Sequence, residues 1–126
     1  MVAKEFAITD AAEGGAHTLA LIGEVDLATA PQLQDAIARL CAAGASQIVL
    51  DLRELTFMDS TGVHALLASK ALCDRHGCDF SLTRGQESVE RLFELTGLRE
   101  ILPFRDAPSG AGPSRNGDGA GDSTSP

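Results

Sequence analysis

Residues 56–62 of the chain read TFMDSTG, and within this stretch an apolar strand ends and a helix begins at a hydroxyl residue. The helix is predicted to start at Ser60 and to run to about Arg75, with Gly77 ending it. Backbone amides in the first turn of a helix lack intrahelical partners, and the peptide dipoles sum there to a partial positive charge. A phosphate on Ser60 would be stabilised by such a terminus, so the stretch is suited to a phosphorylation switch.

Apolar runs on both sides of this stretch predict the strands of a sheet. Two strands, at 6–9 and 18–25, are expected to be neighbours joined by a glycine-containing turn. Residues 48–52, an apolar run with one acid, have the pattern of a strand buried under helices in a mixed or parallel sheet. Short strands are also expected at 80–83 and 101–104, the second at a sheet edge because its proline has no amide hydrogen to donate.

Amphipathic spacing predicts two further helices. Pro31 is a favourable first-turn residue, and apolar side chains recur after it every three or four residues until Gly44. A third helix contains Val89 and Phe93 and ends at Gly97. The order ββαβαβαβ predicts an α/β fold with a mixed sheet of about five strands and helices packed on it.

Composition limits the chain to one domain and excludes several classes of function. Of the 126 residues, 1–105 are expected to form a single domain, whereas 106–126, rich in Gly, Pro and Ser, are expected to be a disordered tail. A net charge of -8 with only ten Lys and Arg residues opposes direct binding to nucleic acid or to a membrane surface. No stretch resembles a signal peptide or a membrane span, so a cytoplasmic protein is expected.

Three motifs follow one another along the chain: GEVD at 23–26, FMDSTG at 57–62 and LFELTGL at 92–98. Together, in this order and spacing, they resemble the anti-sigma factor antagonists (anti-anti-sigma factors), which are small bacterial proteins of the STAS fold. The resemblance extends from about Phe6 to Phe104. It implies that the single domain is a STAS domain.

The resemblance also implies a partner-switching role in transcription regulation. The unphosphorylated protein would bind an anti-sigma factor that has serine kinase activity, and the sigma factor held by that partner would be released. The kinase would then phosphorylate Ser60, which directly follows Asp59, and the complex would dissociate. Thr61 is the less favoured acceptor, and a separate serine phosphatase would reset the switch.

The resemblance further implies a partner surface around Ser60. The predicted partner-binding residues are Glu24, Asp26, Asp59, Thr61, Gly62 and His64. From the residues alone, Ser60 is a helix N-cap and Asp26 a turn residue, while Asp59 orients the Ser60 hydroxyl, caps the helix, or does both. His64 stands where the family commonly has glycine and shares a helix face with Ser60, so it tunes partner choice, responds to pH or is an ordinary surface residue.

A metal site is not expected. Cys73, His76 and Cys78 lie close together in the sequence, but a closed zinc site needs four ligands and no second pair of ligands occurs. With Cys41, the cysteines form an odd set without framework spacing, which is typical of reduced thiols.

Catalytic residues and a cofactor are not expected either. Ser60 lacks the G-x-S-x-G surroundings of a hydrolase nucleophile, and the chain has neither a P-loop nor a G-x-G-x-x-G motif. Asp51 and Asp59 are interpreted as strand-end and cap residues, not as a catalytic carboxylate pair. Two alternative functions stay open: an unmodified STAS subunit that docks on a membrane lipid-transport ATPase complex, and a small serine enzyme, which the missing motif disfavours.

Overall fold

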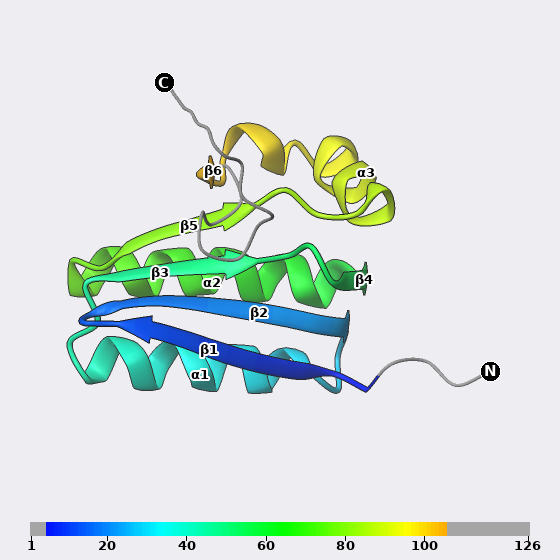
Figure 1. Cartoon of the computed structure of the whole chain (residues 1–126). Coiled ribbons are helices and arrows are strands. Elements are labelled where there is room, and N and C mark those ends of the chain that lie inside the picture. Colours follow the sequence, from blue (N-terminus) through cyan, green and yellow to red (C-terminus); the bar gives the residue numbers. More distant parts are fainter. Residues whose placement is uncertain (1–4, 106–126) are drawn as a thin grey trace, which may run out of the picture.

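The computed structural model describes residues 5–105 (Figure 1). The elements in chain order are β1 (Ala7–Glu13), β2 (Ala16–Val25), α1 (Ala30–Ala42), β3 (Gln47–Asp51), β4 (Leu55–Met58), α2 (Ser60–His76), β5 (Asp79–Thr83), α3 (Glu87–Thr96), the 3-10 helix η1 (Leu98–Glu100) and β6 (Phe104–Arg105). The predicted α/β class with a mixed sheet is confirmed, although the sheet has six strands where about five were expected. The predicted disordered tail at 106–126 lies outside the described residues.

Strand pairing brings the ends of β2 and β4 together. The sheet has the order β1-β2-β3-β5-β6, with β1 antiparallel to β2 and the other neighbours parallel. The first half of β2 pairs with β3, whereas its last residues, Gly23 to Val25, pair in parallel with β4. The chain that leaves β4 therefore starts α2 next to the carboxyl end of β2.

The strand order that was predicted from the sequence does not include β4. The predicted strand end before Ser60 is confirmed, but it belongs to a strand separate from β3. The break between the two strands is short, and it is closed where the Leu55 amide donates to the Leu52 carbonyl at 3.1 Å. So brief an interruption between two apolar runs is hard to recognise from sequence alone, which explains the low strand count.

The prediction for the last strand was wrong in its position. A strand was expected at 101–104, and the structure has β6 at Phe104–Arg105. η1 ends at Glu100, and residues 101–103 form the turn that follows it, in which the amides of Ile101 and Leu102 both donate to the Leu98 carbonyl. The expectation of an edge position is confirmed, since β6 is the last strand in the sheet order.

The core lies between the sheet and two helices. In Figure 1, α1 and α2 lie side by side behind the strands, and the two helices contact each other along their length. Every second residue of β2 from Leu19 to Val25 is buried, while the residues that alternate with them are partly exposed, which is the pattern of a strand with one face against helices. Leu33 of α1 and Leu66 of α2 fill the other side of this core. α3 lies apart from this pair and contacts β4.

The predicted helix ends are confirmed. α2 begins at Ser60 and ends before Gly77, whose φ of 69° is the left-handed conformation that favours glycine. α1 has Pro31 in its first turn, and α3 ends at Gly97. None of the helices in the described part of the chain is long and apolar enough to cross a membrane.

Candidate functional site

The carboxyl ends of β2 and β4 form one edge of the molecule. Val25 pairs with Met58, so the residues that follow, Asp26 and Asp59, leave the sheet together. The Asp59 amide donates to the Val25 carbonyl at 3.3 Å, which fixes the start of α2 against the end of β2. We call this place the β2–β4 edge, and it comprises Glu24, Asp26, Leu27, Phe57, Asp59, Ser60 and His64.

Asp59, not Ser60, is the N-cap of α2. Its Oδ1 accepts hydrogen bonds from the amides of Thr61 at 3.0 Å and Gly62 at 3.2 Å. The capping role considered for Asp59 is thus observed, and the N-cap interpretation of Ser60 was wrong. Ser60 is the first residue inside the helix, and its side chain is exposed.

This cap changes the electrostatic argument for a phosphate on Ser60. The sequence suggested that free first-turn amides would hold the phosphate, but two of these amides already bind the Asp59 carboxylate. A phosphate on Ser60 would have to displace that carboxylate or remain beside a negative charge. The helix terminus alone therefore does not account for the stability of a phosphorylated state.

The two residues after Ser60 are less accessible. Thr61 is half-buried and Gly62 is buried. A Cβ at Gly62 would approach the Met58 side chain too closely and would lie 3.0 Å from Val25 Cγ1. Gly62 thus allows α2 to approach the ends of β2 and β4, which is a packing role; its predicted partner contact stays a prediction.

Asp26 organises the loop between β2 and α1. Its Oδ1 accepts hydrogen bonds from the amides of Ala28 at 3.0 Å and Thr29 at 3.1 Å, so the turn-residue interpretation is what the structure shows. The Thr29 hydroxyl accepts from the Asp26 amide at 2.9 Å and donates to the Glu24 carbonyl at 2.8 Å. Thr29 was missed from the sequence, and a Thr three residues after an Asp in a turn was the available signal.

His64 lies one turn of α2 beyond Ser60 and is exposed. It therefore belongs to the same accessible surface as Ser60, as the helical spacing predicted. Asp51, in contrast, ends β3 and lies outside the β2–β4 edge, so its predicted strand-end role is confirmed.

Two apolar side chains at the β2–β4 edge were missed from the sequence. Leu27, in the loop after Asp26, is 77% exposed, and Phe57 of β4 is 45% exposed. Large apolar side chains that are grouped together and in contact with water are typical of an interaction surface. The signal in the sequence was Leu27 itself, an apolar residue in a polar turn.

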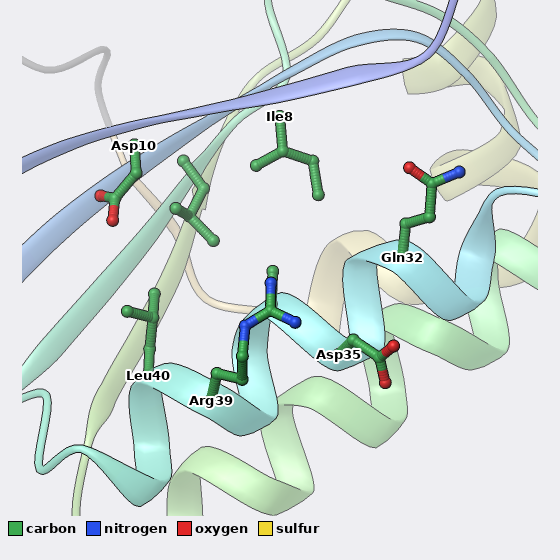
Figure 2. A pocket seen from close by; sticks show the side chains of 8 residues that line it. Ile8, Asp10, Gln32, Asp35, Arg39 and Leu40 are labelled. Atoms are coloured by element: carbon green, nitrogen blue, oxygen red, sulfur yellow. The ribbon is translucent and has the colours of Figure 1, made fainter.

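Two other features of the structure lie away from these residues. A hollow of about 470 Å³ between β1 and α1 is lined by residues that include Ile8, Asp35 and Arg39, but by none of the predicted site residues (Figure 2). Cys73 and Cys78 are brought together as their spacing suggested, but with Cys41 and not with His76, which is exposed.

The fold and the site define a class of protein. Its members have a mixed sheet backed by two helices, and an exposed serine begins the second helix at the carboxyl ends of two strands. The family model of the STAS domain matches residues 8–111, and the chain belongs to this family. A curated relative, the anti-sigma-B factor antagonist of Bacillus subtilis (strain 168), is 30% identical over 82 residues, which are 65% of this chain and 74% of that protein.

Solved structures agree with this assignment. The crystal structure of an anti-sigma factor antagonist from Mycobacterium paratuberculosis has a TM-score of 0.74 and 25% identity, with 85% of this chain and 91% of that chain covered. Unphosphorylated SpoIIAA, an anti-sigma factor antagonist, has a TM-score of 0.70 and 23% identity, with coverage of 84% and 90%. SpoIIAA of Bacillus in its phosphorylated form has a TM-score of 0.65 and 22% identity, with 84% of this chain and 94% of that chain covered. The resemblance to the anti-sigma factor antagonists is confirmed at the level of the family.

Proposed function

We propose that the protein is an anti-sigma factor antagonist that acts by partner switching. The unphosphorylated form binds an anti-sigma factor with serine kinase activity, and the sigma factor is released. Phosphorylation of Ser60 ends this binding, and a serine phosphatase restores it. The observation that carries the proposal is the exposed Ser60 side chain at the first position of α2, surrounded by the β2–β4 edge.

Accessibility supports Ser60 over Thr61 as the phosphate acceptor. A kinase must take the hydroxyl into its own active site, and Ser60 is exposed whereas Thr61 is half-buried. Within residues 5–105, no side chain hydrogen-bonds the Ser60 hydroxyl. The same observation supports modification over nucleophilic catalysis, because a catalytic serine needs a base within hydrogen-bond reach.

The β2–β4 edge has the composition of a partner-binding surface. Leu27 and Phe57 supply exposed apolar side chains, and Glu24, Asp26 and Asp59 of the same edge supply carboxylates. Apolar anchors at the centre of an interface supply most of the affinity, while charges at its rim steer the approach of the partner. We therefore expect the anti-sigma factor to present an apolar pocket bordered by basic residues.

Phosphorylation weakens binding because it adds bulk and charge that must be desolvated where the small Ser60 hydroxyl packs against the partner. A phosphate brings about -1.5 to -2 charges and three strong acceptors to Ser60. Since Asp59 already occupies the Thr61 and Gly62 amides, these two donors do not neutralise the phosphate unless Asp59 is displaced. Burying a poorly neutralised phosphate against a partner is costly, and the complex dissociates.

Capture of the partner tests the proposal. Tagged wild type, Ser60→Ala and Ser60→Asp are produced in the native cells, and captured proteins are identified by quantitative mass spectrometry. We expect Ser60→Ala to retain an anti-sigma factor with an ATP-binding domain and Ser60→Asp to lose it. Ser46→Asp is the matched control. Ser46 is exposed like Ser60, but it precedes the start of β3, whereas the chain continues to β4 from the other end of β3.

The captured partner also has to act as a kinase. Incubated with ATP, it should transfer phosphate to wild type and not to Ser60→Ala. Equal capture by Ser60→Ala and Ser60→Asp, with no phosphate transfer to wild type, contradicts the proposal. No observation on the described residues favours the alternative of a docking subunit in a lipid-transport complex.

A further inference from the structure

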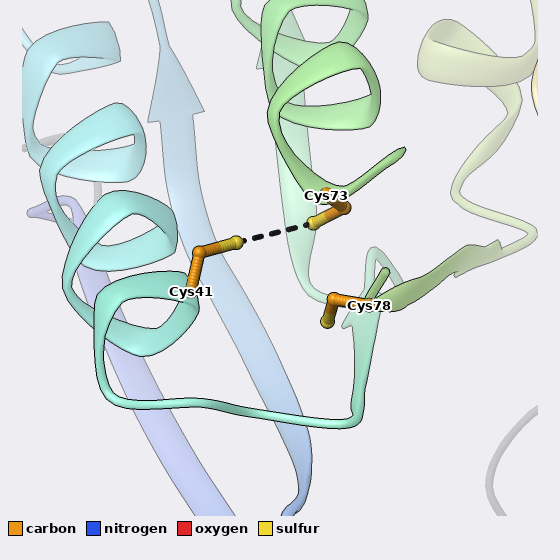
Figure 3. Close-up of side chains that lie close together, drawn as sticks. All are labelled: Cys41, Cys73 and Cys78. Carbon is orange, nitrogen blue, oxygen red and sulfur yellow. Dashed lines mark hydrogen bonds between the residues drawn. The ribbon is translucent and has the colours of Figure 1, made fainter. Parts of the chain in front are cut away.

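Three cysteines from different elements meet inside the molecule (Figure 3). Cys41 lies in the last turn of α1, Cys73 in the last turn of α2, and Cys78 directly before β5. Their sulfur atoms all lie within 4.8 Å of one another, and the sulfurs of Cys41 and Cys73 are 3.7 Å apart. All three side chains are buried. We call them the thiol cluster.

The thiol cluster bears on the expectation, drawn from the sequence, that the chain has no metal site. The sequence suggested Cys73, His76 and Cys78 as possible ligands, which are too few for a closed zinc site. In the structure Cys41, and not His76, lies beside Cys73 and Cys78. Cys41 is 32 residues before Cys73, so no local motif could have shown the association. Three soft sulfur donors that converge in this way are the type of ligand set that suits a thiophilic element.

The buried surroundings select among thiophilic elements by charge. All three cysteines belong to the hydrophobic core, so a charge left at the site would be poorly solvated. Zn²⁺ or Cu⁺ bound by three thiolates would leave a net negative charge in this apolar interior, and an uncompensated buried charge is unfavourable. A trivalent element bound by three thiolates leaves no net charge.

We propose that the thiol cluster binds one trivalent arsenic, or a metalloid of the same class, through the sulfurs of Cys41, Cys73 and Cys78. Arsenous acid reacts with the three thiols: three As–O bonds break, three As–S bonds form, and each hydroxyl leaves as water with one thiol proton. Arsenic stays trivalent and the cysteines are not oxidised, so no oxidant or reductant is needed. The product is neutral, and it draws together the three sulfurs, which lie within 4.8 Å of one another in the structure.

Access to the cluster follows from its place in the fold. Cys41 and Cys73 lie in the last turns of their helices, and helix ends open locally at a lower free energy than the core. Bound arsenic would tie α1, α2 and the start of β5 together and stabilise the folded state. Cys73 is about 20 Å along α2 from Ser60 at the helical rise per residue, so this inference does not rest on the proposed partner switching.

Titration of the reduced, full-length protein with sodium arsenite tests the proposal. The chain has no Trp and no Tyr, so sulfur-to-arsenic charge-transfer absorption is measured in the near ultraviolet against a low protein background. We expect saturation at one arsenic per chain, an intact mass in which one arsenic replaces three protons, and a higher melting temperature.

Variants identify the ligands. Cys41→Ala, Cys73→Ala and Cys78→Ala should each lose the absorption band and the arsenite-dependent rise in melting temperature, whereas His76→Ala, the matched control, should keep both. If an alanine variant does not fold, maleimide labelling of wild type decides, because bound arsenic should protect all three thiols. No adduct with wild type, an adduct that leaves one thiol free, or tighter binding of Zn²⁺ than of arsenite overturns the proposal.

Discussion

Among single residues, Asp59 determines where α2 begins and how Ser60 is presented. Its carboxylate accepts from the Thr61 and Gly62 amides, which would otherwise lack partners. Asp59→Ala should lower the free energy of unfolding by about 1 kcal/mol, and Asp59→Asn, which keeps an acceptor oxygen, should lower it less. Urea unfolding measures both variants. An equal loss in the two would show that charge, and not capping, is what Asp59 contributes.

Gly62 allows the close approach of α2 to the strand ends. A methyl group at this position would press against Met58 and Val25, so Gly62→Ala should lower the free energy of unfolding by about 1–3 kcal/mol, as overpacking does elsewhere. His64→Ala, on the exposed side of the same helix, should change it by less than about 0.5 kcal/mol. Chemical denaturation that finds Gly62→Ala as stable as wild type would refute this packing role.

Leu27 is the residue that best separates binding from stability. Because its side chain is 77% exposed, Leu27→Ser should change the free energy of unfolding by less than about 0.5 kcal/mol. If Leu27 anchors the partner, the same change should reduce capture of the anti-sigma factor about tenfold or more. Ile101→Ser is the control, because Ile101 is also exposed but precedes β6, which β3 and β5 separate from β2 in the sheet. Equal capture by both variants would remove Leu27 from the interface.

At the scale of elements, Asp51 holds the junction at which β3 gives way to β4. Its two oxygens accept from the Arg53 side chain at 2.9 and 2.8 Å, and Oδ1 also accepts from the Arg53 amide at 3.1 Å. The Thr83 hydroxyl of β5 lies 3.4 Å from the same oxygen. Burial by itself raises the pKa of Asp51, but these hydrogen bonds and the charge of Arg53 outweigh it and hold the pKa below 3.8.

The lowered pKa gives the stability of the junction a defined pH dependence. Ionised Asp51 contributes stability that is complete well above pH 3.8, the unfolded-state value, and is lost as the pH falls through the lower folded-state pKa. Wild type should therefore be more stable than Asp51→Asn at neutral pH, and the difference should shrink below pH 3.8. Urea unfolding at several pH values measures it, with Asp35→Asn on the exposed face of α1 as control. A difference that grows on acidification would contradict this account.

At the scale of the whole molecule, local patterns predicted most of the fold. Pro31, Gly77 and Gly97 marked helix ends that the structure confirms, because the conformations of proline and glycine depend on a few neighbouring residues. The helix start at Ser60 was also predicted, although the choice between Ser60 and Asp59 as N-cap needed the positions of individual atoms.

Features that depend on long-range contacts were not predicted. β4 pairs with the end of β2, about 30 residues earlier in the chain, and no local pattern encodes such a pairing. The thiol cluster depends in the same way on the packing of α1 against α2. The exposure of Leu27 and Phe57 also follows from the complete fold, since an apolar side chain in the sequence is expected in the core by default.

The most direct test of the account is the phosphorylation state of Ser60 in native cells. Trypsin releases residues 54–70 as one peptide, which carries Thr56, Ser60, Thr61 and Ser69, and tandem mass spectrometry locates phosphate among them. The account predicts phosphate on Ser60 in part of the protein, in a proportion that changes between growth and stress. Unmodified Ser60 under both conditions, or phosphate confined to another of these residues, would contradict it.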